Sequence, residues 1–157
     1  MKSKIYVETT IVSYLTARPS RELIIEADQI LTRDWWEHKR HVFDVYVSSM
    51  VLQEAMKGDP DASRKRVDLI ETMPILALDE EGIELADRLV ADRILPEKAH
   101  ADALHLAIAT VNRIDYLLTW NCKHLANAVL QKRLRHFMKR NRHELPQICT
   151  PRALMEI

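Results

Sequence analysis

The chain has 157 residues, the usual size of one domain, and 47% of them are hydrophobic, which is enough for a sizeable core. Its 23 basic and 23 acidic residues cancel, which excludes a globally basic nucleic-acid-binding protein but leaves room for a local basic patch. The sequence has no 18-residue apolar run, no signal-peptide core and no metal-type cysteine spacing. We therefore expect a single domain over residues 1–157, located in the cytoplasm, with both thiols reduced.

Short apolar runs alternate along the chain with longer stretches in which apolar residues recur at helical spacing. The run VFDVYVS, residues 42–48, alternates apolar and polar side chains and is typical of a strand. In chain order, we expect a strand at 4–7, a helix at 20–41, a strand at 42–48, a helix capped by Ser48 or Ser49 and ended by 57–60, a helix at 61–73, a strand at 75–78, helices at 80–94 and 96–113, a strand at 116–119, a helix at 126–143, a strand at 147–150 and a short helix from Pro151.

This alternation of strands and helices predicts an α/β domain with a central, mainly parallel sheet. In such sheets ligands bind beyond the carboxyl ends of the strands. Four acidic or amide residues fall near those expected ends: Glu8, Glu54, Asp102 and Asn121. Glu8 and Asn121 directly follow strands, whereas Glu54 and Asp102 lie on helices that begin at the same rim.

Carboxylates that lie within a few ångströms of one another repel and raise each other's pKa, and a divalent cation removes that cost. Oxygen ligands favour Mg²⁺ or Mn²⁺. Such an ion can activate a water for attack on a phosphodiester. The four residues therefore indicate a metal-dependent phosphodiesterase site.

Each of these residues also has a structural interpretation. Glu8 can be a solvated acid at a strand end, and Glu54 a surface acid on its helix. Asn121 can cap the next helix, and Thr9 and Thr10 can cap a short helix that begins at Ile11.

Asp102 is the most informative of the four, because it lies on the apolar segment HADALHLAIATV, which is expected to pack inside. An acid there needs a partner or a metal. His105 is three residues further on, so we expect it to be a hydrogen-bonding neighbour of Asp102 rather than a catalytic group.

Four stretches together resemble the PIN-domain ribonucleases, and most of all the VapC-type toxins of type II toxin–antitoxin systems. They are YVETT, VSSMVLQEAMKGD, HADALHLAIATVNRIDYLLTWNCKHLAN and ICTPRALME. The resemblance covers nearly the whole chain, and residues 102–127 are its most specific part. It implies a PIN-like three-layer α/β/α sandwich with a central, mainly parallel sheet of four to five strands.

The resemblance also implies an activity, in which a Mg²⁺- or Mn²⁺-activated water cleaves RNA. Carried over residue by residue, the metal and catalytic positions are Glu8, Glu54, Asp102 and Asn121, and Thr9 or Thr119 is a hydroxyl near the site. The implied partners are RNA, a cognate antitoxin and a second copy of the chain in a homodimer.

Two positions depart from the family pattern. The first acid is usually Asp and here is Glu8, and the last is often Asp and here is Asn121. Three negative charges in place of four are expected to weaken metal binding. The alternative function is therefore a catalytically weak or inactive PIN-like module that binds RNA or a protein.

Residues 132–143, KRLRHFMKRNRH, carry six Lys or Arg residues and no acid. This run is either a solvated helix face or a patch that contacts phosphates. The candidate RNA contacts are Lys123, Arg133, Arg135, Lys139 and Arg140.

Overall fold

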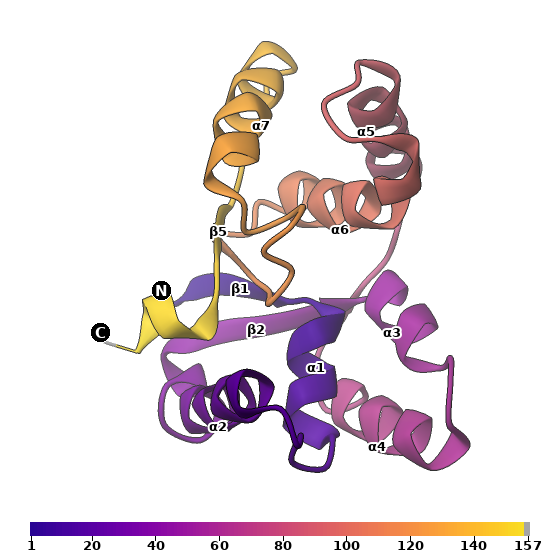
Figure 1. Ribbon diagram of the computed structural model, residues 1–157. Coiled ribbons are helices and arrows are strands. Elements are labelled where there is room, and N and C mark those ends of the chain that lie inside the picture. Colours follow the sequence, from indigo (N-terminus) through magenta and orange to yellow (C-terminus); the bar gives the residue numbers. More distant parts are fainter. Residues whose placement is uncertain (156–157) are drawn as a thin grey trace.

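The computed structural model describes residues 1–155, which form one sheet covered by helices on both faces (Figure 1). Its elements, with 3₁₀ helices written η, are β1 (Ser3–Val7), α1 (Thr9–Thr16), α2 (Leu23–His38), η1 (Arg40–Val42), β2 (Phe43–Ser48), α3 (Ser49–Ala55), α4 (Pro60–Ile70), β3 (Ile75–Leu76), α5 (Glu80–Ala91), η2 (Glu97–Ala99), α6 (His100–Val111), β4 (Tyr116–Leu118), α7 (Ala128–Arg140), β5 (Gln147–Cys149) and η3 (Pro151–Leu154).

The five strands are all parallel and lie in the order β3-β2-β1-β4-β5. The chain builds β2 and β3 on one side of β1 and then returns to place β4 and β5 on the other side. Strand order therefore reverses between β1 and β4, and in open parallel sheets ligands bind beyond the carboxyl ends of the strands at such a point.

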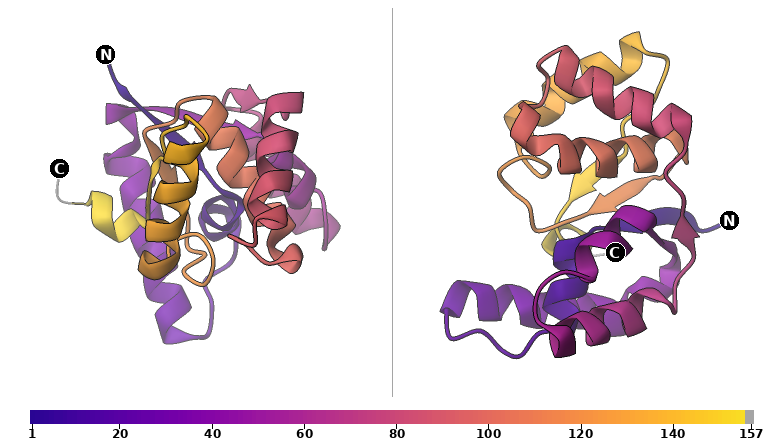
Figure 2. Two further views of the ribbon diagram at one scale, coloured as in Figure 1. Left: turned by 90° about the horizontal axis from the view of Figure 1, so that it is seen from above. Right: turned by 90° about the vertical axis from the view of Figure 1, so that its right-hand side faces the viewer.

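The helices form two outer layers. In Figure 1, α5, α6 and α7 lie above the sheet and α1, α2 and α4 lie below it, and the right-hand view of Figure 2 shows the same three layers. The predicted α/β/α sandwich with a parallel sheet is thus confirmed.

The core lies along β1 and α6. In β1, Ile5, Tyr6 and Val7 are fully buried, because this strand is central and covered on both faces. Helix α6 buries every residue from Ala103 to Thr110 except Leu104, and its alanines allow it to lie close to the sheet.

Several predicted boundaries were wrong. The helix expected at 126–143 begins at Ala128, because the Asn127 side chain accepts hydrogen bonds from the backbone of Val129 and Leu130 and residues 122–125 form turns. The helix expected at 96–113 is split into η2 and α6. Between residues 1 and 155, no helix is both long and apolar enough to span a bilayer.

Candidate metal centre

Glu8 lies at the carboxyl edge of the sheet, where strand order reverses. Its backbone N–H donates to the carbonyl of Leu118 at 3.1 Å, which continues the pairing of β1 with β4. It is the N-cap residue of α1, but its side chain makes no capping hydrogen bond and is only 5% exposed. Its carboxylate therefore turns inward, which rules out the solvated strand-end acid that we considered.

Two threonine hydroxyls hold one oxygen of this carboxylate. Glu8 Oε1 accepts from Thr10 Oγ1 at 2.5 Å and from Thr119 Oγ1 at 2.6 Å. Each hydroxyl in turn accepts a backbone N–H at 2.9 Å, Thr10 from Trp120 and Thr119 from Asn121. Because these N–H groups fix the direction of the two hydroxyls, Oε1 of Glu8 is held in place. Oε2 of Glu8 has no hydrogen-bond partner among residues 1–155.

Glu54 has the same arrangement on the other side of the site. It projects from α3, and its Oε1 accepts from Thr9 Oγ1 at 2.7 Å and from His105 Nε2 at 2.5 Å. In the described part of the chain its Oε2 is likewise left without a hydrogen bond. Thr9 and Thr10 thus serve the two glutamates and do not cap a helix, because α1 already begins at Thr9.

The pKa values of Glu54 and His105 reflect this pairing. Burial acts to raise the pKa of Glu54, but the hydrogen bond and charge of His105, the hydrogen bond of Thr9 and the charge of Lys57 together hold the pKa below its ordinary value. Burial acts to lower the pKa of His105, but the bond to Glu54 and the charges of Glu8, Glu54 and Asp102 raise it above its ordinary value. Both shifts favour an ionised carboxylate beside the imidazole.

His105 does not pair with Asp102 as expected. Its side chain is fully buried and lies between Glu54 and the hydroxyl of Tyr6, which is 2.6 Å from Nδ1. Asp102, one turn earlier on α6, turns toward the loop after β4 instead. The expectation failed because three-residue spacing places two helical residues on one face but does not fix the direction of their side chains.

Asp102 is bound by two residues of that loop. Its Oδ1 accepts from Asn121 Nδ2 at 3.1 Å, and its Oδ2 accepts from His124 Nδ1 at 3.0 Å. The Asn121 amide oxygen accepts the backbone N–H of His124 at 3.1 Å, so Asn121 caps this turn. The expectation that Asn121 caps the next helix was wrong, because Asn127 is the N-cap of α7. His124 was missed from the sequence, although its position three residues after Asn121 is the spacing of such a cap.

The four predicted residues thus form two groups joined through Thr119. Ligand atoms of Glu8, Glu54 and His105 all lie within 4.8 Å of one another. Asp102 and Asn121 are linked to Glu8 by the Asn121 N–H, which donates to the Thr119 hydroxyl. Two free carboxylate oxygens, with a third acid linked to Glu8 through Asn121 and Thr119, fit a hard divalent cation, and the imidazole of His105 also suits Mn²⁺.

The basic residues on α7 lie on its exposed face, opposite the buried Leu134, Phe137 and Met138. Arg133 donates to the carbonyl of Arg93 at 3.0 Å and so has a structural role. Lys123 is exposed in the loop beside His124. Lys139 lies near the far end of α7, about 18 Å from the Asn127 cap at 1.5 Å per helical residue.

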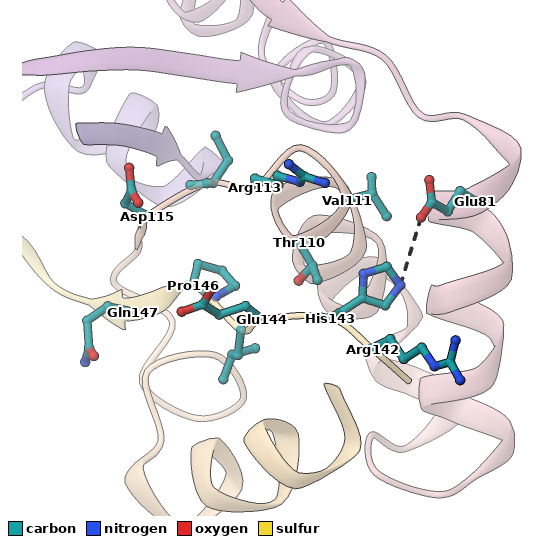
Figure 3. Close-up of a pocket in the computed structure, with 12 residues that line it drawn as sticks. Glu81, Thr110, Val111, Arg113, Asp115, Arg142, His143, Glu144, Pro146 and Gln147 are labelled. Carbon is teal, nitrogen blue, oxygen red and sulfur yellow. Dashed lines mark ion pairs between the residues drawn. The ribbon is translucent and has the colours of Figure 1, made fainter. Parts of the chain in front are cut away.

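A cavity of about 770 Å³ lies at the amino ends of β4 and β5, away from the carboxyl edge that carries Glu8 (Figure 3). Its lining mixes acids with bases, and His143 lies 4.0 Å from the Glu81 carboxylate. This cavity is separate from the candidate metal centre, because it adjoins the amino ends of the strands.

No family model matches the sequence, and no curated protein does. Solved structures do match the fold. VapC20 of Mycobacterium tuberculosis, a toxin that cleaves the sarcin-ricin loop, has a TM-score of 0.61 and 16% identity over 76% of this chain and 92% of its own.

Two complexes match along more of the chain. VapBC2 of Rickettsia felis, bound to a promoter DNA fragment, has a TM-score of 0.58 and 14% identity over 93% of this chain and 98% of its own. A toxin–antitoxin complex of Klebsiella pneumoniae has a TM-score of 0.57 and 18% identity over 95% of this chain and 98% of its own. The chain therefore has the PIN-like α/β/α fold that these toxin structures share.

Proposed function

We propose that the protein is a metal-dependent endoribonuclease and the toxin of a toxin–antitoxin pair. The observation that carries this proposal is the pair of carboxylates, Glu8 and Glu54, each held at one oxygen with the other left open at the point where strand order reverses. Fixed oxygen ligands with open coordination positions are what a Mg²⁺ or Mn²⁺ nuclease requires.

Glu8, Glu54 and Asp102 would hold the ion, which when bound supplies an activated water and charge stabilisation at phosphorus. Thr9 and Thr119 fix the two glutamate carboxylates by donating to them. Asn121 acts through its bond to Asp102, so its role is to orient that carboxylate.

RNA is the proposed substrate, and the exposed basic groups would contact its phosphates. Of the five candidates, Lys123 lies in the same loop as Asn121 and His124, so it is the best placed to bind a strand at the centre. Arg135, Lys139 and Arg140 would extend that contact along the exposed face of α7.

A cognate antitoxin is the proposed partner, because two of the structural neighbours are complexes of a toxin with its antitoxin. Helix α2 exposes Leu23, Ile24 and Ile30 at 82%, 79% and 58%, and apolar side chains exposed together are of the kind that protein partners cover. We also propose a homodimer, as the sequence resemblance implies.

Cleavage of single-stranded RNA with Mg²⁺ or Mn²⁺, and again with a chelator, tests the activity. We expect Asp102→Asn to slow cleavage by about a hundredfold or more, because the ion contributes several kcal/mol at the transition state. Asp68→Asn removes an exposed carboxylate on α4 and is the matched control. Equal rates for the parent and Asp102→Asn would refute the assignment of the site.

The alternative, an RNA- or protein-binding module that does not cut, is favoured by one observation. Both oxygens of Asp102 are already hydrogen-bonded, and so is the amide oxygen of Asn121. If calorimetry detects no Mn²⁺ binding at millimolar concentration while RNA still binds, the alternative holds.

A further inference from the structure

Three polar side chains form a hydrogen-bonded series that ends at Glu54, and none of them is exposed. They are Ser48 at the end of β2, Tyr6 in β1 and His105 in α6, each with 0% of its surface accessible. They come from three separate elements and meet only in the folded chain. Apolar residues of similar size would fill the same space, so packing alone does not explain this line of polar atoms.

The hydrogen bonds along this line form one continuous series. The Val51 N–H donates to Ser48 Oγ at 3.2 Å, Ser48 Oγ lies 2.7 Å from the Tyr6 hydroxyl, and that hydroxyl lies 2.6 Å from His105 Nδ1. His105 Nε2 then lies 2.5 Å from Glu54 Oε1.

The direction of the series follows from its two ends. A carboxylate only accepts, so His105 Nε2 carries a hydrogen, and a backbone N–H only donates, so Ser48 accepts from Val51. Every hydrogen in between has a partner if Ser48 donates to Tyr6 and Tyr6 donates to His105. The bond from Nε2 to Glu54 is present whether the imidazole is neutral or protonated.

We propose that Ser48, Tyr6 and His105 are positioning residues that fix the Glu54 carboxylate for the ion, an inference that rests on the proposed function. Thr9 and His105 bind the same oxygen from two directions, which stops rotation of the carboxylate and directs Oε2 away from them. When the imidazole is neutral, the Tyr6 hydroxyl donates to Nδ1 and so keeps the hydrogen of the ring on Nε2. Hydrogen-bond partners of metal ligands typically change metal affinity by about 10- to 100-fold.

The test measures Mn²⁺ affinity without RNA, by calorimetry and by electron paramagnetic resonance. We expect His105→Leu to weaken binding by at least about tenfold, and His105→Gln to recover most of it, because its amide can donate from near the position of Nε2. Tyr6→Phe keeps the packing of the ring and is expected to weaken binding by several-fold. Tyr46→Phe, in the paired position on β2, is the control and should bind as the parent does.

Thermal unfolding establishes that each variant is folded, and Tyr6→Phe tests the inference even if His105→Leu does not fold. If His105→Leu and Tyr6→Phe are folded and bind Mn²⁺ as tightly as the parent, the inference is overturned and the proposed function stays intact. A nitrogen bonded directly to Mn²⁺ in pulsed resonance spectra, lost in His105→Gln, would also overturn it, since His105 would then be a ligand. Failure of the parent to bind Mn²⁺ would overturn both proposals.

Discussion

Shortening Glu8 to aspartate tests whether the length of this side chain is matched to its site. Glu8→Asp keeps the charge but withdraws the carboxylate by about 1.5 Å, the length of one carbon–carbon bond. The hydroxyls of Thr10 and Thr119, now 2.5 and 2.6 Å from Oε1, cannot follow, because backbone N–H groups of Trp120 and Asn121 hold them. Both hydrogen bonds would lengthen beyond the range in which they are effective.

The magnitude follows from these two bonds. A hydrogen bond to a charged group contributes about 1.5–3 kcal/mol, and a free carboxylate must be ordered again when the ion binds. Relaxation of the backbone can recover part of this lost free energy. If about 1.4 kcal/mol of it remains lost, Mn²⁺ affinity falls about tenfold. We therefore expect at least a tenfold rise in the dissociation constant for Mn²⁺, with a parallel fall in metal-dependent RNA cleavage.

Calorimetric titration with Mn²⁺ measures this change directly. Glu8→Gln is the complementary variant, because it keeps the length and removes the charge. Glu84→Asp shortens an exposed glutamate on α5 and controls for nonspecific effects. An affinity in Glu8→Asp equal to that of the parent would refute the reasoning, since the extra methylene would then have no fitted role.

Three further predictions concern the site and the thiols. In His124→Ala, Mn²⁺ affinity should rise about tenfold by calorimetry, because a hydrogen bond of about 1.5 kcal/mol to the Asp102 carboxylate no longer competes with the ion; a fall would mean that His124 assists binding. In the metal-free protein, the lowered pKa of Glu54 stabilises the folded state above pH 4.5, the ordinary pKa of a glutamate. The raised pKa of His105 stabilises the folded state below pH 6.5, the ordinary pKa of a histidine. Urea unfolding of Glu54→Gln should therefore show the largest loss in the free energy of unfolding between pH 4.5 and 6.5. A loss that does not vary with pH would contradict the pairing of Glu54 with His105. Iodoacetamide at about pH 8 should label exposed Cys122 alone by mass spectrometry, because burial raises the pKa of Cys149 to about 11, and two labels would contradict its burial.

The sequence was sufficient to predict the five strands and the edge at which the acids gather. Alternating and helical hydrophobic patterns are local signals, and parallel strands necessarily end at one edge. The approach of Glu8 and Glu54 could be expected on these grounds, because Glu8 directly follows β1 and Glu54 lies on the helix that follows the neighbouring strand β2.

The partners of each acid could not be predicted in the same way. His105 bonds to Glu54 across 51 residues of sequence, and Thr119 bonds to Glu8 across 111. Such pairs depend on how far each helix is rotated against the sheet, which spacing within one segment does not determine. The same limit concealed His124, whose contact with Asp102 requires the turn that Asn121 caps.

The central position of β1 has a consequence for how the protein assembles. Glu8 directly follows β1 with an extended backbone and is two residues from Tyr6, so the two side chains project to the same face, and both take part in the network around Glu54 and Thr119. A slip of one residue against β2 or β4 would turn both side chains to the other face at once. A molecule with misregistered β1 would therefore not form the candidate metal centre, so we expect Mn²⁺ affinity to report the register of β1 against its two neighbouring strands.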